Sequence, residues 1–296
     1  MNIIETIKEL GSSITLTDII ICVPGLTLLG IWMLTTSLGR KALADSVPRR
    51  NNMPFYLPFI PLFIWLAIIL AATLTKEMLL PDLLDWQNAY LDNLILCIGA
   101  ILAIAVILFL AKGHFARRLR GFGLSAKTIH KDLFSAVVNL ISVYPLVAVA
   151  LILTLFFGKI IYGPQFEMQK HQELELIGQH PQLELRVLVV VTVIVVMPVF
   201  EEMLFRGLFQ TIIRSFLWNF DFRISKLRCR QPVWLAIVLS SAIFAAVHAN
   251  AGHWPALFVL ALCMGYAYEK SGSLLRPIFI HSFFNATSII FALHNT

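Results

Sequence analysis

The stretch Val187–Arg206, VLVVVTVIVVMPVFEEMLFR, decides the fold class. It carries no charged residue before Glu201, and an apolar run of this length is typical of a transmembrane helix. Glu201, Glu202 and Arg206 then follow within the same predicted helix. A charge near the centre of a bilayer helix costs about 2.5–3.5 kcal/mol on insertion scales. Because such residues are kept where they are paired, hydrated or functional, the stretch predicts both a membrane span and a candidate site.

The composition of the whole chain agrees with a membrane protein. Hydrophobic residues make up 58% of the 296 residues and charged residues only 14%, whereas soluble domains have about 25% charged residues. We therefore predict an all-α integral membrane protein with about eight transmembrane helices, whose catalytic or binding residues lie in spans 5–8. The expected spans are Ile14–Leu38, Phe55–Leu74, Leu91–Ala111, Leu133–Phe157, Val187–Phe209, Val233–Ala249, Pro255–Tyr268 and Leu274–Leu293.

The distribution of positive charge predicts how the chain is oriented. A net charge of +6 could indicate nucleic-acid binding, but 17 of the 23 Lys and Arg residues fall in the loops after spans 1, 3, 5 and 7. Only 4 lie in the N-terminus and the alternate loops. By the positive-inside rule, the first set of loops faces the cytoplasm and both termini lie outside. The charge therefore indicates membrane topology, and we expect no nucleic-acid partner.

Three other features bear on the class of protein. The basic segment Lys112–Asp132, with interleaved aromatic residues, is expected to lie on anionic lipid headgroups, with substrate docking as the alternative. The first 13 residues lack a basic n-region, so we expect the first span to be retained. The cysteines are scattered without a CxxC pair, which predicts neither a disulfide framework nor a cysteine metal site. They are Cys22, Cys97, Cys229 and Cys263.

The chain divides by its content of ionisable residues. Spans 1–4 contain almost none, whereas spans 5–8 contain two glutamates, an arginine and two histidines. We interpret residues 1–183 as a membrane scaffold and residues 184–296 as the functional core.

The two adjacent glutamates are expected to play different roles. Glu202 and Arg206 are four residues apart, so they share a helical face and are expected to form an ion pair. Glu201 points about 100° away and has no local partner. A general base is the role that such a carboxylate could take. The alternative is that all three residues form a structural network that holds this helix to its neighbours.

Two histidines and an asparagine in later spans supply further candidates. His248 ends the sixth span, and His281 and Asn285 lie one turn apart in the eighth. A lone intramembrane histidine is more often a packing residue. Together with Glu201, however, these residues are the parts of a hydrolase that activates water and stabilises an oxyanion. His248 is expected in the outer half of the membrane, so a tilted or displaced sixth helix is needed to bring it level with Glu201.

Zinc is the alternative for the same residues. Two histidines with one or two glutamates, here His248, His281 and Glu201, would suit a zinc ion with an open position. The chain has no HExxH sequence, the spacing that puts two histidines on one helical face. The carboxylate–water hypothesis is therefore favoured, with no cofactor required and zinc as the alternative.

Three motifs in this order resemble the CPBP family, the CAAX-processing and bacteriocin-processing intramembrane endopeptidases, also called the Abi family. They are EExxxR at 201–206, FxxxH at 244–248 and HxxxN at 281–285. The flanking sequences FRGLFQ and SGSLLRPIFIHSFFN agree, and the resemblance covers roughly a third of the chain, from Val187 to Ile290.

The resemblance implies a role for each motif residue. Glu201 would be the base that activates water, and His248 would help to hold that water. His281 and Asn285 would contribute to the oxyanion site, while Glu202 and Arg206 would be supporting residues.

The resemblance also implies an activity. The chain would be an intramembrane endopeptidase similar to type II CAAX prenyl endopeptidases, cleaving a peptide bond near the cytoplasmic membrane surface. Its partners would be the lipid bilayer and a membrane-associated or lipidated peptide or protein, and its location a bacterial cytoplasmic membrane. The alternatives are a non-proteolytic binding or immunity factor that retains the motifs, and a proton or ion carrier, which would also use buried Glu and His.

Overall fold

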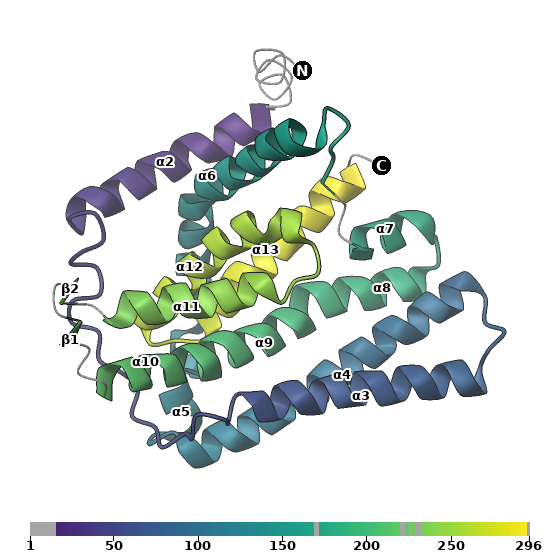
Figure 1. The fold of residues 1–296 in the computed structure, drawn as a ribbon, viewed down its shortest axis with the longest axis horizontal. Coiled ribbons are helices and arrows are strands. Elements are labelled where there is room, and N and C mark those ends of the chain that lie inside the picture. The colour runs from purple at the N-terminus through teal and green to yellow at the C-terminus, as the bar shows by residue number, and fades with distance from the viewer. Residues whose placement is uncertain (1–15, 169–171, 220–222, 225–226, 229–231, 295–296) are drawn as a thin grey trace.

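The computed structural model describes residues 16–168, 172–219, 223–224, 227–228 and 232–294 (Figure 1). The first 13 residues and Cys229, for which the sequence made predictions, lie outside the described residues. The described part is a bundle of α-helices with one antiparallel pair of two-residue strands, β1 (Arg223–Ile224) and β2 (Leu227–Arg228). This confirms the predicted all-α class.

A helix overlaps each of the eight predicted spans. In chain order these are α2 (Leu16–Thr35), α3 (Phe59–Leu79), α4 (Asp85–His114), α6 (Ile129–Tyr162), the continuous helix Leu183–Asn219, α11 (Pro232–Ala246), α12 (Trp254–Ser271) and α13 (Leu275–His294). Shorter helices are α5 (Arg118–Phe122), α7 (Gln172–Gln179) and the 3₁₀ turns η1 (Ala126–Thr128) and η4 (Ala251–His253).

The number of membrane-crossing helices is smaller than eight when length and composition are both required. Within the described residues, four helical stretches are long and apolar enough to cross a membrane: Phe59–Leu79, Asp85–His114, Ala126–Tyr162 and Leu183–Trp218. The apolar stretches of α2 and α11, Ile19–Thr35 and Val233–Ala246, are shorter. The predicted count of eight spans is therefore not confirmed.

The continuous helix Leu183–Asn219 changes its hydrogen-bonding register twice. It consists of α8 (Leu183–Val191), the π-helical η2 (Thr192–Val196), α9 (Met197–Glu202), the π-helical η3 (Met203–Gln210) and α10 (Thr211–Asn219). Pro198 follows the first π segment and has no backbone N–H, which explains a local departure from α-helical bonding there. Single π turns inside helices often occur at functional sites.

This helix lies at the centre of the fold. The α3–α4 hairpin packs along one side of it, and α11 and α13 pack along others (Figure 1). Helix α6 contacts α2, α12 and α13, and so closes the far side of the bundle. Gly207 permits a close approach of α5 to this helix, because a Cβ there would lie only 2.3 Å from the ring of Phe122.

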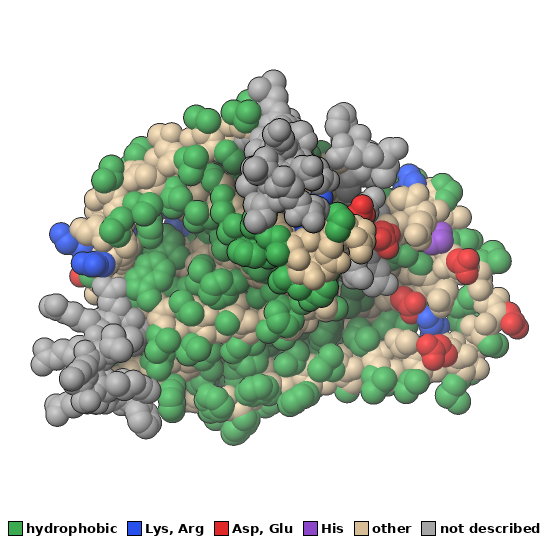
Figure 2. Space-filling view, turned by 45° about the horizontal axis from the view of Figure 1, so that its top comes forward, with side chains coloured by type: hydrophobic (Ala, Val, Ile, Leu, Met, Phe, Trp, Pro, Cys, Tyr) green, Lys and Arg blue, Asp and Glu red, His purple; other side chains and the backbone are tan. Residues whose placement is uncertain are grey.

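The surface has the pattern expected of a protein that contacts lipid. Figure 2 shows a band of hydrophobic side chains between an end with Lys and Arg and an end with mostly Asp and Glu. Large apolar side chains on α3, α4 and α6 are well exposed, among them Phe63 (62%), Leu70 (62%), Phe109 (78%) and Phe134 (72%). Exposed apolar surface on this scale is unusual for a soluble monomer and is typical of a membrane interface.

Candidate active site

The expected ion pair on the central helix is present and has a third member. Arg206 Nη1 donates to Glu202 Oε1 at 2.8 Å, and both side chains are buried. His281 Nδ1 lies 3.0 Å from the same oxygen, so helix α13 is joined to α9 through Glu202. Arg206 also reaches the carbonyl of Ala261 at 3.4 Å. The pair therefore links three helices.

Glu201 lies beside this cluster and makes fewer contacts. Its side chain is 16% exposed, and its Oε2 lies 3.9 Å from His281 Nε2, beyond hydrogen-bonding distance. Within the described part of the chain that oxygen has no hydrogen-bond partner. A buried carboxylate oxygen without a partner is rare, and such atoms call for a specific explanation.

His248 lies just beyond the end of helix α11. The sixth span was predicted to continue to Ala249, but α11 ends at Ala246, so His248 lies in the bend that follows. Its Nδ1 contacts the carbonyl of Phe244 at 2.7 Å. A carbonyl only accepts, so Nδ1 carries the proton and Nε2 of the neutral ring is left as an acceptor.

The ring of Phe244 lies at the centre of these groups. Its centroid is 4.8 Å from the ring of His248 and 5.8 Å from that of His281, the latter edge-on. The guanidinium of Arg206 lies over it at 4.4 Å. One aromatic side chain therefore sets the separation of the two histidines and covers the buried cation.

The orientation of Asn285 follows from the break in helical register. In a π segment the carbonyl of residue i accepts from the N–H of residue i+5, as Thr192 does from Met197. The next such bond would join Val193 to Pro198, which has no N–H. Asn285 Nδ2 instead donates to the carbonyl of Val193 at 2.9 Å. This bond uses one amide proton and leaves the other available.

The four predicted site residues line one cavity. Glu201, His248, His281 and Asn285 all contribute to a hollow of about 180 Å³, with apolar walls that include Leu96, Leu257 and Phe284. A space of this size can hold several water molecules. A carboxylate, two imidazoles and an amide thus face a small space bounded by apolar side chains, which can hold water and a peptide group.

A metal centre has less support in the geometry. Among the residues that the structure describes, no group of three or more His, Cys, Asp or Glu side chains is arranged to hold a metal ion. A zinc site needs three protein ligands at about 2.0–2.3 Å from the ion. The described residues do not form such a set.

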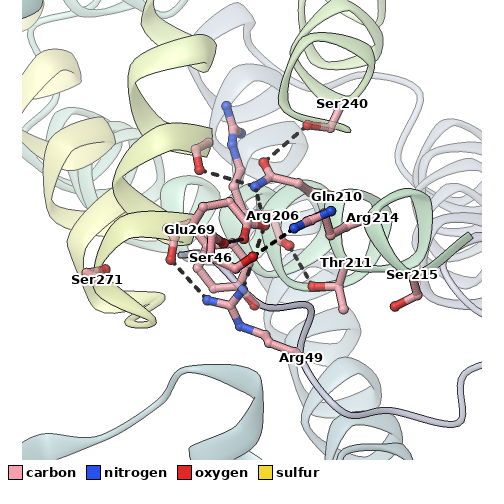
Figure 3. Close-up of polar contacts among 12 residues, drawn as sticks. Ser46, Arg49, Arg206, Gln210, Thr211, Arg214, Ser215, Ser240, Glu269 and Ser271 are labelled. Atoms are coloured by element: carbon pink, nitrogen blue, oxygen red, sulfur yellow. Dashed lines mark hydrogen bonds and ion pairs between the residues drawn. The ribbon is translucent and has the colours of Figure 1, made fainter. Parts of the chain in front are cut away.

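A second buried polar cluster was missed by the sequence reasoning. Gln210 donates to the carbonyl of Gly265 at 3.2 Å and to Glu269 Oε1 at 3.1 Å, and it accepts from Ser240 at 3.2 Å (Figure 3). Glu269 Oε2 accepts from Ser46 at 3.1 Å. The sequence held one indication of it: Gln210 follows Glu202 and Arg206 at the same four-residue spacing, which places all three on one side of the helix.

Comparison with known families agrees with the motif order. Residues 183–287 match the family model described as type II CAAX prenyl endopeptidase Rce1-like. This part of the chain therefore carries an Rce1-like domain, in agreement with the resemblance to the CPBP family. The matched model is one of endopeptidases, and together with the four apolar helices the match supports a multi-pass membrane protein.

The other comparisons add less. The chain is 29% identical over 99 residues to an uncharacterized 24.3 kDa protein of Escherichia coli, which corresponds to 32% of this chain and 40% of that protein. The match thus spans less than half of the length of this relative. No solved structure matches the chain.

Proposed function

We propose that this protein is an intramembrane endopeptidase that hydrolyses a peptide bond with a water molecule activated by Glu201. The observation that carries the proposal is the cavity where a partnerless carboxylate oxygen meets two histidines and an asparagine. The Rce1-like match over residues 183–287 supports the same class of reaction. In this proposal residues 1–183 form the membrane scaffold and residues 184–296 the catalytic core.

The first step in the proposed reaction is activation of water. Glu201 takes one proton from the water, and Nε2 of His248 accepts a hydrogen bond from the other. The bond from His248 Nδ1 to the carbonyl of Phe244 holds the ring in the tautomer that this role requires. The water oxygen attacks the substrate carbonyl carbon, and a tetrahedral oxyanion forms.

The oxyanion is stabilised by donors on α13. The second amide proton of Asn285 is available because the first is bonded to Val193, which fixes the plane of the amide. His281 can donate from Nε2 when both of its nitrogens are protonated, with Nδ1 held by Glu202. When the C–N bond breaks, the proton held by Glu201 passes to the leaving nitrogen. Water is thereby divided between the two products.

The position of the cavity bears on where the peptide bond is reached. Val193 lines the cavity and lies before Glu201 on the stretch Leu183–Trp218. The basic loop follows the other end of this stretch, so the cavity extends from Glu201 away from that loop. Ser288, which also lines the cavity, lies beyond His281 in the same direction away from that loop. We therefore propose that the bond is cleaved within the bilayer, deeper than the cytoplasmic membrane surface that the resemblance implied. The substrate would be a membrane-associated or lipidated peptide or protein, and the membrane a bacterial cytoplasmic membrane.

The test is a cleavage assay with the full chain reconstituted in lipid nanodiscs. A library of membrane-associated peptides, with and without a prenylated cysteine, would be incubated with the protein and the products identified by mass spectrometry. We expect Glu201→Gln to lower the rate by about 10²–10⁴-fold, the usual contribution of a general base. Glu77→Gln is the matched control, because Glu77 is an exposed carboxylate on α3 away from the cavity.

Two outcomes would overturn the proposal. Equal rates for the wild type and Glu201→Gln would remove Glu201 from the chemistry. A wild type that cleaves nothing, while Glu201→Gln still supports the biological role in cells, would favour a binding or immunity factor. A third arm addresses zinc: loss of activity with a chelator and recovery with Zn²⁺ would replace the metal-free mechanism.

A further inference from the structure

A large basic pocket lies at the opposite end of the molecule from the acidic surface. It has a volume of about 790 Å³ and lies between the loop after α2, helix α5 and the end of α12. Five cationic side chains line this basic pocket, against two carboxylates, Asp45 and Glu269. The cations are Arg49, Arg50, Arg117, Arg120 and Lys270.

Two of these cations are fixed in the walls. Arg49 Nη2 donates to the carbonyl of Tyr268 at 3.0 Å, and its guanidinium stacks over the ring of Tyr268 at 3.5 Å. Its side chain is only 12% exposed. Lys270 Nζ donates to the carbonyl of Ala42 at 2.8 Å. The walls of the basic pocket are therefore rigid and positively charged before any ligand arrives.

Backbone pairing brings the other cations together. Ala116 N–H donates to the carbonyl of Arg50 at 3.1 Å, and Asn51 forms an isolated bridge with Phe115. Arg50 is thereby held beside Arg117, and Arg120 follows on α5. These three side chains are exposed and make no hydrogen bond or ion pair with the residues that the structure describes. Their guanidinium groups are available to a ligand.

The carboxylates do not neutralise the basic pocket. Both oxygens of Glu269 accept hydrogen bonds, from Gln210 and from Ser46, and Oε1 also lies 3.8 Å from Arg49. Glu269 thus balances the charge of Arg49. Asp45 is exposed and is one negative charge against the remaining four positive charges.

The basic pocket lies at the level where lipid headgroups are expected. Helix α3 begins at Phe59, α4 ends at His114, and the stretch Ala126–Tyr162 begins shortly after α5. Three of the four apolar stretches therefore begin or end near the loops that line the pocket. Val47, which also lines it, is 73% exposed and gives the rim an apolar side.

We propose that the basic pocket binds the phosphate headgroup of an anionic membrane lipid, with Arg50, Arg117 and Arg120 as its ligands. Guanidinium groups bind phosphate through paired hydrogen bonds, and basic pockets between helices at a membrane surface suit anionic headgroups. This proposal concerns lipid binding alone and does not depend on the proposed protease activity.

The experiment measures lipid binding by the full chain in detergent, using native mass spectrometry. The probes are dioleoylphosphatidylglycerol, dioleoylphosphatidylcholine and inorganic phosphate. We expect the anionic lipid to bind at least tenfold more tightly than the zwitterionic lipid. The triple variant Arg50→Gln/Arg117→Gln/Arg120→Gln should lose about 100-fold in affinity for the anionic lipid, because three headgroup contacts are removed.

The matched control removes the same charge from the same predicted membrane face. Lys112, Lys127 and Lys131 are exposed and lie outside the basic pocket, so the corresponding triple Gln variant should bind the anionic lipid like the wild type. An equal loss in the control would indicate diffuse attraction and overturn a defined pocket. Equal binding of both lipids, or competition by inorganic phosphate at the concentration of the lipid, would overturn the lipid headgroup as ligand.

Discussion

Two buried polar clusters lie on the same continuous helix, and they differ in how completely their atoms are bonded. At Gln210 and Glu269, both carboxylate oxygens and both ends of the amide have partners. At the candidate site, Oε2 of Glu201 and Oε2 of Glu202 have none within the described residues. Buried polar atoms are usually satisfied, so the first cluster has the bonding of a structural element. In the second cluster, Glu201 lines a cavity with a carboxylate oxygen that has no partner, and such an oxygen can bond a water molecule or a substrate.

The largest expected effect on stability comes from breaking the ion pair of the candidate site. Arg206→Met leaves the carboxylate of Glu202 buried without its cation, and removing one partner of a buried pair costs about 3–5 kcal/mol. The free energy of unfolding in mixed micelles, from an SDS titration, measures this loss.

The control for that variant removes both charges. Glu202→Met/Arg206→Met should recover much of the stability, because an apolar pair of similar volume leaves no buried charge. A double variant no more stable than Arg206→Met would show that the cost arises from lost packing on Phe244 and not from the unpaired carboxylate.

A smaller effect is expected at the fully bonded cluster. Glu269→Leu removes the acceptor of Gln210, Ser46 and Arg49, and a hydrogen bond to a charged group is worth about 1.5–3 kcal/mol. We expect a loss of stability of about that size, measured by the same titration. The cleavage rate per folded molecule should be unchanged. A rate that falls more than the folded fraction would mean that this cluster also takes part in the chemistry.

The smallest effect compares two neighbouring serines on α11. Ser240 donates to Gln210 at 3.2 Å, so Ser240→Ala should cost about 1 kcal/mol, the typical net value of one hydrogen bond. Ser241 is equally buried, but its hydroxyl has no partner among the described residues, so Ser241→Ala should cost nothing or stabilise the fold. Equal costs for the two serines would contradict the difference in bonding on which the comparison rests.

The spacing of residues along the sequence predicted the features that lie within a single helix. The pair at 202 and 206 follows from helical periodicity alone, and long apolar runs predicted where helices form. The predicted number of membrane-crossing helices was not confirmed. Helix α11, for example, ends three residues before the predicted boundary, and its apolar stretch is short. Helix ends depend on local bonding that hydropathy does not report.

Local sequence patterns could not predict which residues of different helices contact each other. The predicted depth of His248 separated it from Glu201, whereas both residues line one cavity in the structure. The partners of Gln210 lie 55 and 59 residues away along the chain, so no local pattern identifies them. The convergence of Glu201, His248, His281 and Asn285 in one cavity also depends on three helices packing together, and the sequence indicated it through residue type and motif order, not through local spacing. Their catalytic roles remain a prediction.

The missing backbone proton of Pro198 has a consequence for variation in this chain. Pro198 contacts no substrate in the proposed reaction, yet any other residue there would supply an N–H that competes with Asn285 for the carbonyl of Val193. The carbonyl of Val193 would then be shared between two donors, and the bond that orients the side chain of Asn285 would be weaker. Pro198 thus affects the conformational freedom of the Asn285 side chain, 87 positions later in the chain. A substitution at position 198 would change the dynamics of Asn285.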